Sequence, residues 1–256
     1  MELITLPWSS LLLFVPVMIF AGLVHGALGL GFPMVATPVI ALFVDVRVAI
    51  FITLLPTVMV NLASVGGNNN VQFVVVRYLP MALAAMLGSA IGSAILAISN
   101  AEVFRLLLAM LILAFLWTQH QKKLPDQWLR INQLALPIMV GLLAGFAGGT
   151  TNVMVAILLI YFLSAQVARA EMITAMNLCF LLGKLSQIAV FLFIGAMTLQ
   201  MLLKTLPLAL VALGSLLVGQ SISQNIPQQR YQIWLRYFLV ILACVLIIQF
   251  LMSLIR

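Results

Sequence analysis

Lys184 is the residue whose type and position point most clearly to chemistry, because it lies deep inside apolar sequence. It stands more than ten residues from either end of a long apolar run at 170–195. A charged side chain is costly at the centre of a bilayer and usually marks a substrate or ion pathway. We therefore expect Lys184 to supply positive charge to an anion or to titrate during transport. The alternative is a structural ion pair with Asp45 or Glu171, although Glu171 precedes Lys184 by thirteen residues on the same predicted helix, about 20 Å along it.

Two glycine-containing interruptions of apolar sequence are the next candidates. Their residues are His25, Gly26, Gly29 and Gly31 in the first, and Gly148, Gly149, Thr150, Thr151 and Asn152 in the second. Glycine costs a helix about 1 kcal/mol relative to alanine, so we expect a helix to stop at each interruption. The N-terminus of the helix that follows would offer free N–H groups and a partial positive charge to an anion. Close helix packing through small residues is the alternative explanation.

Polar residues also follow one face of each of two predicted helices. They are Thr53, Thr57, Asn61 and Ser64 in the helix at 48–65, and Thr174, Asn177, Lys184 and Gln187 in the helix at 170–195. Such a face turns toward a bundle interior or a cavity rather than toward lipid. Asn61 and Asn177 are therefore candidates for solute contact, and interhelical hydrogen bonding explains them equally well. His25 could bind an anion or carry a proton, or form an internal hydrogen bond only.

The composition indicates that the elements carrying these residues lie in a membrane. Hydrophobic residues make up 65% of the chain and charged residues 7%, far from the average of soluble domains. Several runs of about 18 or more apolar residues follow one another, each long enough to span a bilayer. We predict a multi-pass membrane domain with no room for a soluble one. Residues 1–7 lack a basic region, so we expect no cleavable signal sequence.

Other classes of function are disfavoured. The net charge of +7 comes from residues scattered over segment ends, which indicates membrane topology rather than nucleic-acid binding. The two histidines and two cysteines are far apart in the sequence, unlike the ligands of a metal site. The stretch 141–151 lacks the lysine of a nucleotide-binding loop, and the chain has only five acidic residues. We expect no enzyme, no catalytic residue, no metal and no cofactor.

The order of apolar segments occurs twice. The predicted elements are 10–24, 33–44, 48–65, 73–98 and 102–119 in the first half, and 133–147, 152–163, 170–195, 200–221 and 232–254 in the second. Gly22 precedes Gly145 by 123 residues, and Ser64 precedes Ser186 by 122. The sequence thus predicts a tandem duplication. Its parts are a first membrane repeat at 1–119, a cytoplasmic linker at 120–131 and a second membrane repeat at 132–256.

Helix length predicts how the broken segments cross the membrane. As one straight helix, residues 10–44 would measure about 52 Å, against a hydrocarbon core of about 30 Å. We expect each broken pair to be a thin hairpin or a re-entrant pair that returns the chain to its starting side. The halves are then inverted, and with both termini outside most basic residues lie inside. The predicted fold is an all-α polytopic membrane protein of two inverted repeats, each a broken or re-entrant helix pair plus three transmembrane helices.

The duplicated interruption resembles the sulfite exporter TauE/SafE family, also described as sulfur-compound or sulfonate permeases. The resemblance rests on residues 22–38, on their partner at 145–152 and on a length of about 250 residues, and it covers nearly the whole chain. Both breaks depart from the compact triple glycine of the family pattern, and a family-typical proline is missing from 157–161. The resemblance implies a permease for sulfite or sulfonates in the bacterial inner (plasma) membrane.

Together these observations predict a secondary transporter of a small anion that works by alternating access, with proton coupling left open. The resemblance implies a sulfur oxyanion or an organosulfonate as cargo. A passive anion channel and a non-transporting membrane partner of a larger complex are the alternatives. The expected partners are a small anionic solute and the lipid bilayer, with no nucleic acid, and a homodimer is left open.

Overall fold

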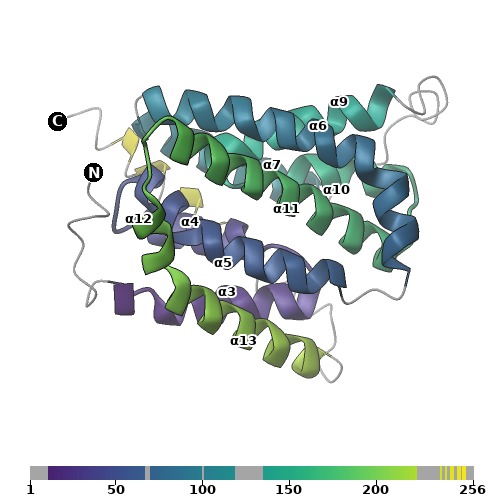
Figure 1. The fold of residues 1–256 in the computed structure, drawn as a ribbon, viewed down its shortest axis with the longest axis horizontal. Helices are drawn as coiled ribbons and strands as arrows, with labels where there is room; N and C mark the ends of the chain where they lie inside the picture. Colours follow the sequence, from purple (N-terminus) through teal and green to yellow (C-terminus); the bar gives the residue numbers. More distant parts are fainter. Residues whose placement is uncertain are drawn as a thin grey trace.

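The computed structural model describes residues 11–66, 70–99, 101–118 and 135–223, together with isolated positions between 237 and 251. Regular structure in these residues is helical (Figure 1). The helices are α3 (Val15–Leu28), α4 (Phe32–Ile40), α5 (Val46–Gly66), α6 (Val71–Ile98), α7 (Ala101–Thr118), α9 (Ala135–Thr151), α10 (Val155–Ser164), α11 (Arg169–Phe193), α12 (Leu199–Lys204) and α13 (Leu206–Ser223). The predicted linker at 120–131 and most of the predicted helix at 232–254 lie outside the described residues.

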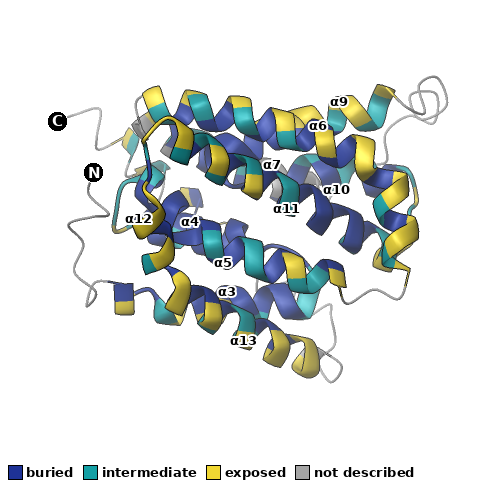
Figure 2. Ribbon diagram, in the orientation of Figure 1, coloured by how far each residue is buried: buried dark blue, intermediate teal, exposed yellow. Residues whose placement is uncertain are grey.

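The outer surface of the helix bundle is apolar. Among the residues that the structure describes, three helices, α5, α6 and α11, are long and apolar enough to cross a membrane, and the shorter helices α3, α9, α10 and α13 are apolar as well. Large side chains such as Phe193, Ile98 and Leu13 are 92%, 86% and 74% exposed, and Figure 2 shows exposed residues along the outward faces of the helices. An exterior of this kind suits contact with lipid. The described part of the chain is all-helical, and its exterior is that of a membrane protein.

Glycines bring helices from the two halves of the chain close together. A Cβ atom added to Gly145 of α9 would lie 2.0 Å from the Ala85 carbonyl oxygen of α6. A Cβ atom on Gly26 of α3 would lie 2.2 Å from the Leu216 carbonyl oxygen of α13. Helix α3 of the first half therefore packs against α13 of the second half, and α9 of the second half packs against α6 of the first half. Both pairs lie side by side in Figure 1. Small residues allow backbones to approach this closely in membranes.

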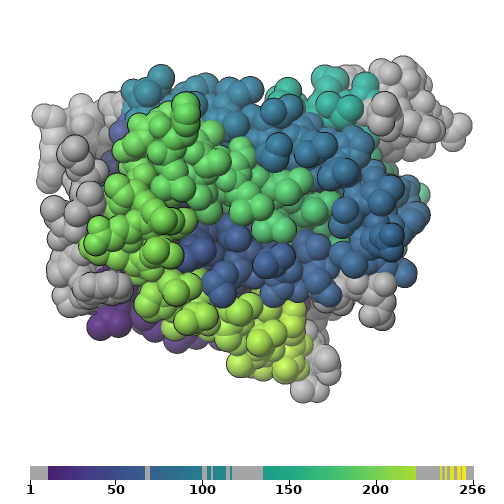
Figure 3. Space-filling model, viewed as in Figure 1, coloured from purple at the N-terminus to yellow at the C-terminus, as the bar shows by residue number. Residues whose placement is uncertain are grey.

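The long helices α5 and α11, which occupy matching places in the two halves, run in opposite directions. Phe51 near the start of α5 packs edge-on against Phe191 near the end of α11, with ring centroids 4.9 Å apart. Figure 3 shows the side chains of α5, α6, α11 and α13 filling one face of the molecule. The helix pairs α3–α4 and α9–α10 flank α5 and α11. Helices α5 and α11 therefore position the residues that lie between the helices of each pair.

The first predicted interruption is present, and the second begins later than expected. Helix α3 ends at Leu28 and α4 begins at Phe32. Helix α9 continues through Gly148 and Gly149 as far as Thr151, so the expectation that these glycines stop the helix was wrong. The physical reason is packing, because a Cβ atom on Gly149 would lie only 2.4 Å from the Ser89 carbonyl oxygen of α6. The contact with α6 offsets the intrinsic helix cost of glycine.

The predicted helix at 200–221 is two helices rather than one. Helix α12 ends at Lys204 and α13 begins at Leu206, with Thr205 between them. Pro207 lies in the first turn of α13. Proline lacks the N–H that a continuous helix would need there, so the chain starts a new helix instead. The other predicted segments at 48–65, 73–98, 102–119 and 170–195 match helices to within a few residues.

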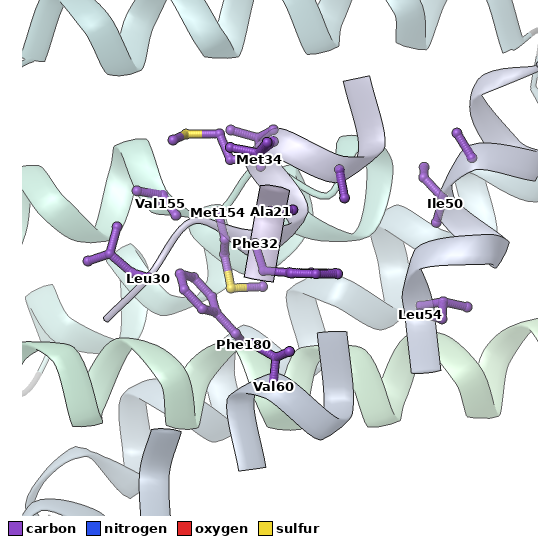
Figure 4. Close-up of a cluster of buried hydrophobic side chains, with 14 of the residues drawn as sticks. Ala21, Leu30, Phe32, Met34, Ile50, Leu54, Val60, Met154, Val155 and Phe180 are labelled. Atoms are coloured by element: carbon purple, nitrogen blue, oxygen red, sulfur yellow. The ribbon is translucent and has the colours of Figure 1, made fainter. Parts of the chain in front are cut away.

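We call residues 29–31, between α3 and α4, the first break, and residues 152–154, between α9 and α10, the second break. Apolar side chains in and beside the two breaks meet in one core cluster. Figure 4 shows Leu30 and Phe32 in or beside the first break, Met154 of the second break and Phe180 of α11 in this cluster. Phe32 is fully buried, and Met154 and Phe180 are nearly so. The polar atoms of each break are thus enclosed in apolar surroundings, where hydrogen bonds and charges act at low dielectric.

Candidate functional site

The first break is built on two glycines with left-handed backbone. Gly29 has φ 82° and Gly31 has φ 105°, a conformation that costs other residues roughly 1–2 kcal/mol. A Cβ atom on Gly29 would also lie 2.8 Å from the Ile173 side chain of α11, whereas one on Gly31 would meet nothing closer than 3.8 Å. The chain can therefore reverse direction between α3 and α4 while its backbone stays close to α11.

His25 holds the two sides of the first break together. It lies in the last turn of α3 and is fully buried. Its Nδ1 atom accepts a hydrogen bond from the backbone N–H of Phe32, at 3.3 Å, and its Nε2 atom lies 3.0 Å from Ser64 Oγ. Since Nδ1 accepts, the ring in this arrangement is neutral and donates from Nε2. The first N–H of α4, which the sequence suggested for anion binding, is occupied by the imidazole.

Asn177 connects α11 to the same break. Its Nδ2 atom donates to the Gly29 carbonyl oxygen at 2.7 Å and to the Ile173 carbonyl oxygen at 2.8 Å. The Oδ1 atom of Asn177 is buried and accepts no hydrogen bond. The Asn177 side chain lies beside the His25 ring, whose single N–H, on Nε2, is directed to Ser64 Oγ instead. The structure thus brings His25, Gly29 and Asn177 together, as the sequence suggested for a site at this break.

Asn152 forms the second break in place of glycine. Its backbone has φ 66°, which asparagine tolerates better than most residues. Its Nδ2 atom donates to Thr37 Oγ1 of α4 at 2.8 Å and to Thr53 Oγ1 of α5 at 2.9 Å. These two hydroxyls are 3.1 Å apart. One side chain therefore joins the second break to helices of the first half.

Lys184 lies against the second break and is only 2% exposed. Its Nζ atom donates to Asn152 Oδ1, to Gln187 Oε1 and, at 3.4 Å, to the Gly148 carbonyl oxygen. Gln187 Nε2 in turn donates to the Gly149 carbonyl oxygen at 2.8 Å. No carboxylate among the described residues forms an ion pair with Lys184. The ammonium therefore lies at the C-terminal, negative end of α9 among neutral oxygens.

The expected ion-pair partner of Lys184 is engaged elsewhere. Glu171 accepts hydrogen bonds from Arg77 at 3.0 Å and from the Tyr78 hydroxyl at 2.9 Å. Asp45 accepts from the backbone N–H of Arg47 at 2.7 Å. Both carboxylates therefore form their hydrogen bonds near the starts of α5 and α11. Lys184 has no countercharge among the described residues.

Four other predicted site residues lie in α9 or α3 without a free polar side chain. Thr150 and Thr151 donate their hydroxyls to carbonyl oxygens of the preceding turn of α9. Thr151 Oγ1 also accepts from the backbone N–H of Val153 at 3.3 Å. Gly148 contributes its carbonyl oxygen to Lys184, and Gly26 packs against α13 as described above. In this conformation the hydroxyls satisfy backbone groups rather than standing open to a solute.

Asn61 is fully buried, and both polar atoms of its amide lack a hydrogen-bond partner in the described structure. It lies on the polar face of α5, one turn before Ser64, which contacts His25. An unsatisfied buried amide costs about 1–3 kcal/mol. A buried group of this kind calls for a ligand or water.

The two breaks lie at different depths rather than meeting at one point. Asn177 contacts the first break and Lys184 contacts the second, and seven residues separate them, which is about 10 Å along α11. The second break touches the middle of α4 through Thr37, not its N-terminus. Sequence reasoning placed Thr53 and Gln187 on polar faces but not in the site, and it missed Thr37. The available signal for Thr37 was a hydroxyl residue inside an apolar run.

Comparison with known protein families gives a match that extends over residues 14–249 and is described as Sulfite exporter TauE/SafE. Comparisons with curated proteins and with solved structures find no match. The matched family consists of membrane transporters of sulfur compounds and not of enzymes, in agreement with the apolar helices of the structure. Since the match covers nearly the whole chain, the protein belongs to the sulfite exporter TauE/SafE family.

Proposed function

We propose that this protein is a secondary transporter that carries a sulfur oxyanion or an organosulfonate across the bacterial inner membrane by alternating access. The observation that carries the proposal is Lys184, a buried ammonium at a helix break whose described partners are all neutral oxygens. Intramembrane charges of this kind mark substrate or ion pathways. The transported anion would supply the negative charge that Lys184 lacks among its protein partners.

The surroundings of Lys184 favour an anion. Taking an ammonium out of water is costly, and neutral hydrogen-bond acceptors offset only part of that cost. An anion that displaces Asn152 Oδ1 or Gln187 Oε1 from Nζ would replace a neutral acceptor with a charged one. Hydrogen bonds to charged acceptors are about twice as strong as neutral ones.

The halves of the chain support alternating access as inverted repeats, with 1–119 and 132–256 as the repeat units. The matching helices α5 and α11 are antiparallel, which is expected when one half is turned over relative to the other. Helices α3 and α9, which lead into the breaks, each pack on the other half, so motion of one repeat against the other would carry the breaks with it. Transporters built from inverted repeats bind solute near the midplane at broken helices.

Flux measurements in proteoliposomes test the proposal. Sulfite, sulfate, a small sulfonate and a carboxylate are compared, each with and without an imposed ion gradient. Saturable flux of a sulfur anion that a gradient drives uphill supports a secondary transporter. Flux that only follows the anion's own gradient would show a channel. An absence of flux for all four anions would contradict the proposal and favour a non-transporting partner.

A further inference from the structure

We propose that the first break holds a binding site for a monovalent alkali cation, formed by the amide oxygens of Asn61 and Asn177 beside the backbone at Gly29. The site is distinct from the anion position at Lys184. As a coupling site it rests on the proposed transport function, whereas cation binding itself does not. The contrast between the two breaks leads to this inference.

Unpaired oxygens mark the position. Asn177 Oδ1 is buried without a hydrogen-bond donor, although its own Nδ2 is fixed to the Gly29 carbonyl oxygen at the break. Asn61 Oδ1 is equally buried and unpaired, and so is its Nδ2. Either orientation of the Asn61 amide therefore leaves an oxygen without a partner. Buried polar atoms are almost always satisfied in native structures, so two such oxygens on adjacent helices indicate a missing ligand.

The electrostatics of the first break favour a positive ligand. Helix α3 ends there at Leu28, and the C-terminal end of a helix carries a partial negative charge. His25 accepts at Nδ1 from Phe32 N and is therefore neutral. The backbone N–H of Phe32, at the start of α4, is the donor in that same hydrogen bond. The groups left without a hydrogen bond beside this break are the amide oxygens of Asn61 and Asn177 and the Nδ2 group of Asn61.

At the second break the protein itself supplies the positive charge, through the Lys184 side chain. There the C-terminal carbonyl oxygens of α9 face Lys184 Nζ and Gln187 Nε2. In the register that pairs Ser64 with Ser186, Lys184 matches Leu62, the neighbour of Asn61. Leu62 is 58% exposed and cannot serve the first break. A mobile cation would supply there the positive charge that the lysine supplies in the second half.

The ligand set favours a monovalent ion. The described residues contain no group of three His, Cys, Asp or Glu side chains that could hold a metal, and Ca²⁺ and Mg²⁺ sites rely on carboxylates. Amide and backbone carbonyl oxygens are neutral, hard ligands, and unwound carbonyls at half-helix C-termini coordinate Na⁺ in other transporter folds. The free N–H groups of Asn61 could hold a water molecule of the ion's hydration shell.

The test is the thermal stability of purified protein in sodium, potassium or choline chloride at equal ionic strength, with no sulfur anion present. Cation binding should raise the melting temperature by a few degrees in sodium or potassium over choline. The Asn61→Leu variant should lose that increase. Asn61→Asp, which keeps an oxygen and adds charge, should retain or enlarge it. Sodium and potassium are compared with each other to identify the ion.

Two controls separate this proposal from general salt effects and from anion transport. Thr57→Val, on the same face of α5, removes a hydroxyl that donates only within its own helix, so its cation response should match the unmodified protein. Lys184→Met should also keep the response while losing anion flux. Equal melting temperatures in all three salts would overturn the proposal, as would a full response in both Asn61→Leu and Asn177→Leu. Since chloride is the same in all three salts and no sulfur anion is present, neither result depends on whether the cargo is identified.

Discussion

Both helix breaks contain left-handed backbone that separates two helices, but the side chains around the two breaks differ in charge. The first uses glycines, Gly29 and Gly31, and a neutral His25 that covers the start of the next helix. The second uses Asn152 in left-handed conformation and a buried ammonium from Lys184. The two halves of the chain therefore share the interruption but not its charge. The difference suggests one break for an anion and the other for a counter-ion.

The largest expected effect comes from removing the charge of the second break. Lys184→Met should lower anion affinity about 100-fold, because a hydrogen bond to a charged group contributes up to about 3 kcal/mol. Saturation of flux or of a binding isotherm measures the loss. The matched control is Leu62→Met, at the corresponding position of the first half, which is exposed and should leave affinity unchanged. Unaltered anion binding in Lys184→Met would make Lys184 a structural residue.

Substituting a glycine that lies against the backbone of a neighbouring helix should lower stability more than substituting a glycine that only provides a left-handed backbone conformation. Gly26→Ala places a methyl group 2.2 Å from the Leu216 carbonyl oxygen and should cost about 3 kcal/mol of stability or more. Gly31→Ala places its methyl group no closer than 3.8 Å to another side chain and should cost only the left-handed strain, roughly 1–2 kcal/mol. Thermal unfolding in detergent compares the two. A larger loss in Gly31→Ala would reverse this assignment of roles.

Substitutions of Asn152 separate its backbone role from its side-chain role. Asn152→Gly keeps the left-handed backbone without strain and loses the hydrogen bonds to Thr37 and Thr53. Asn152→Ala loses the same bonds and adds strain, so it should be less stable than Asn152→Gly by about 1 kcal/mol. Both should impair anion flux. Equal stability of the two variants would show that the backbone at 152 is not under strain.

The smallest expected effect concerns the hydrogen bond that supports His25. Ser64→Ala removes the partner of His25 Nε2 and should cost about 1 kcal/mol of stability. Ser221→Ala is the control, since the exposed Ser221 donates only to its own helix and should stay within about 0.5 kcal/mol. A Ser64→Ala variant as stable as the control would mean that His25 holds the break without α5.

Most of the helix order follows from the sequence because apolar run length and Gly or Pro position decide it. The second break could not be located from composition, since Gly148 and Gly149 look like helix breakers until the backbone of α6 is known to lie against them. The polar faces of α5 and α11 were visible from spacing alone. The connection of Asn152 to Thr37, 115 residues apart, was not, because it depends on how the two halves pack.

The most direct test of the account is gradient-driven flux of sulfite and a small sulfonate in proteoliposomes, with the unmodified protein and Lys184→Met measured in parallel. We predict saturable uphill flux of one sulfur anion with the unmodified protein and its near-complete loss in the folded variant. Equal flux from both proteins would contradict the central role of the second break. No flux of either anion with the unmodified protein would contradict the proposed cargo.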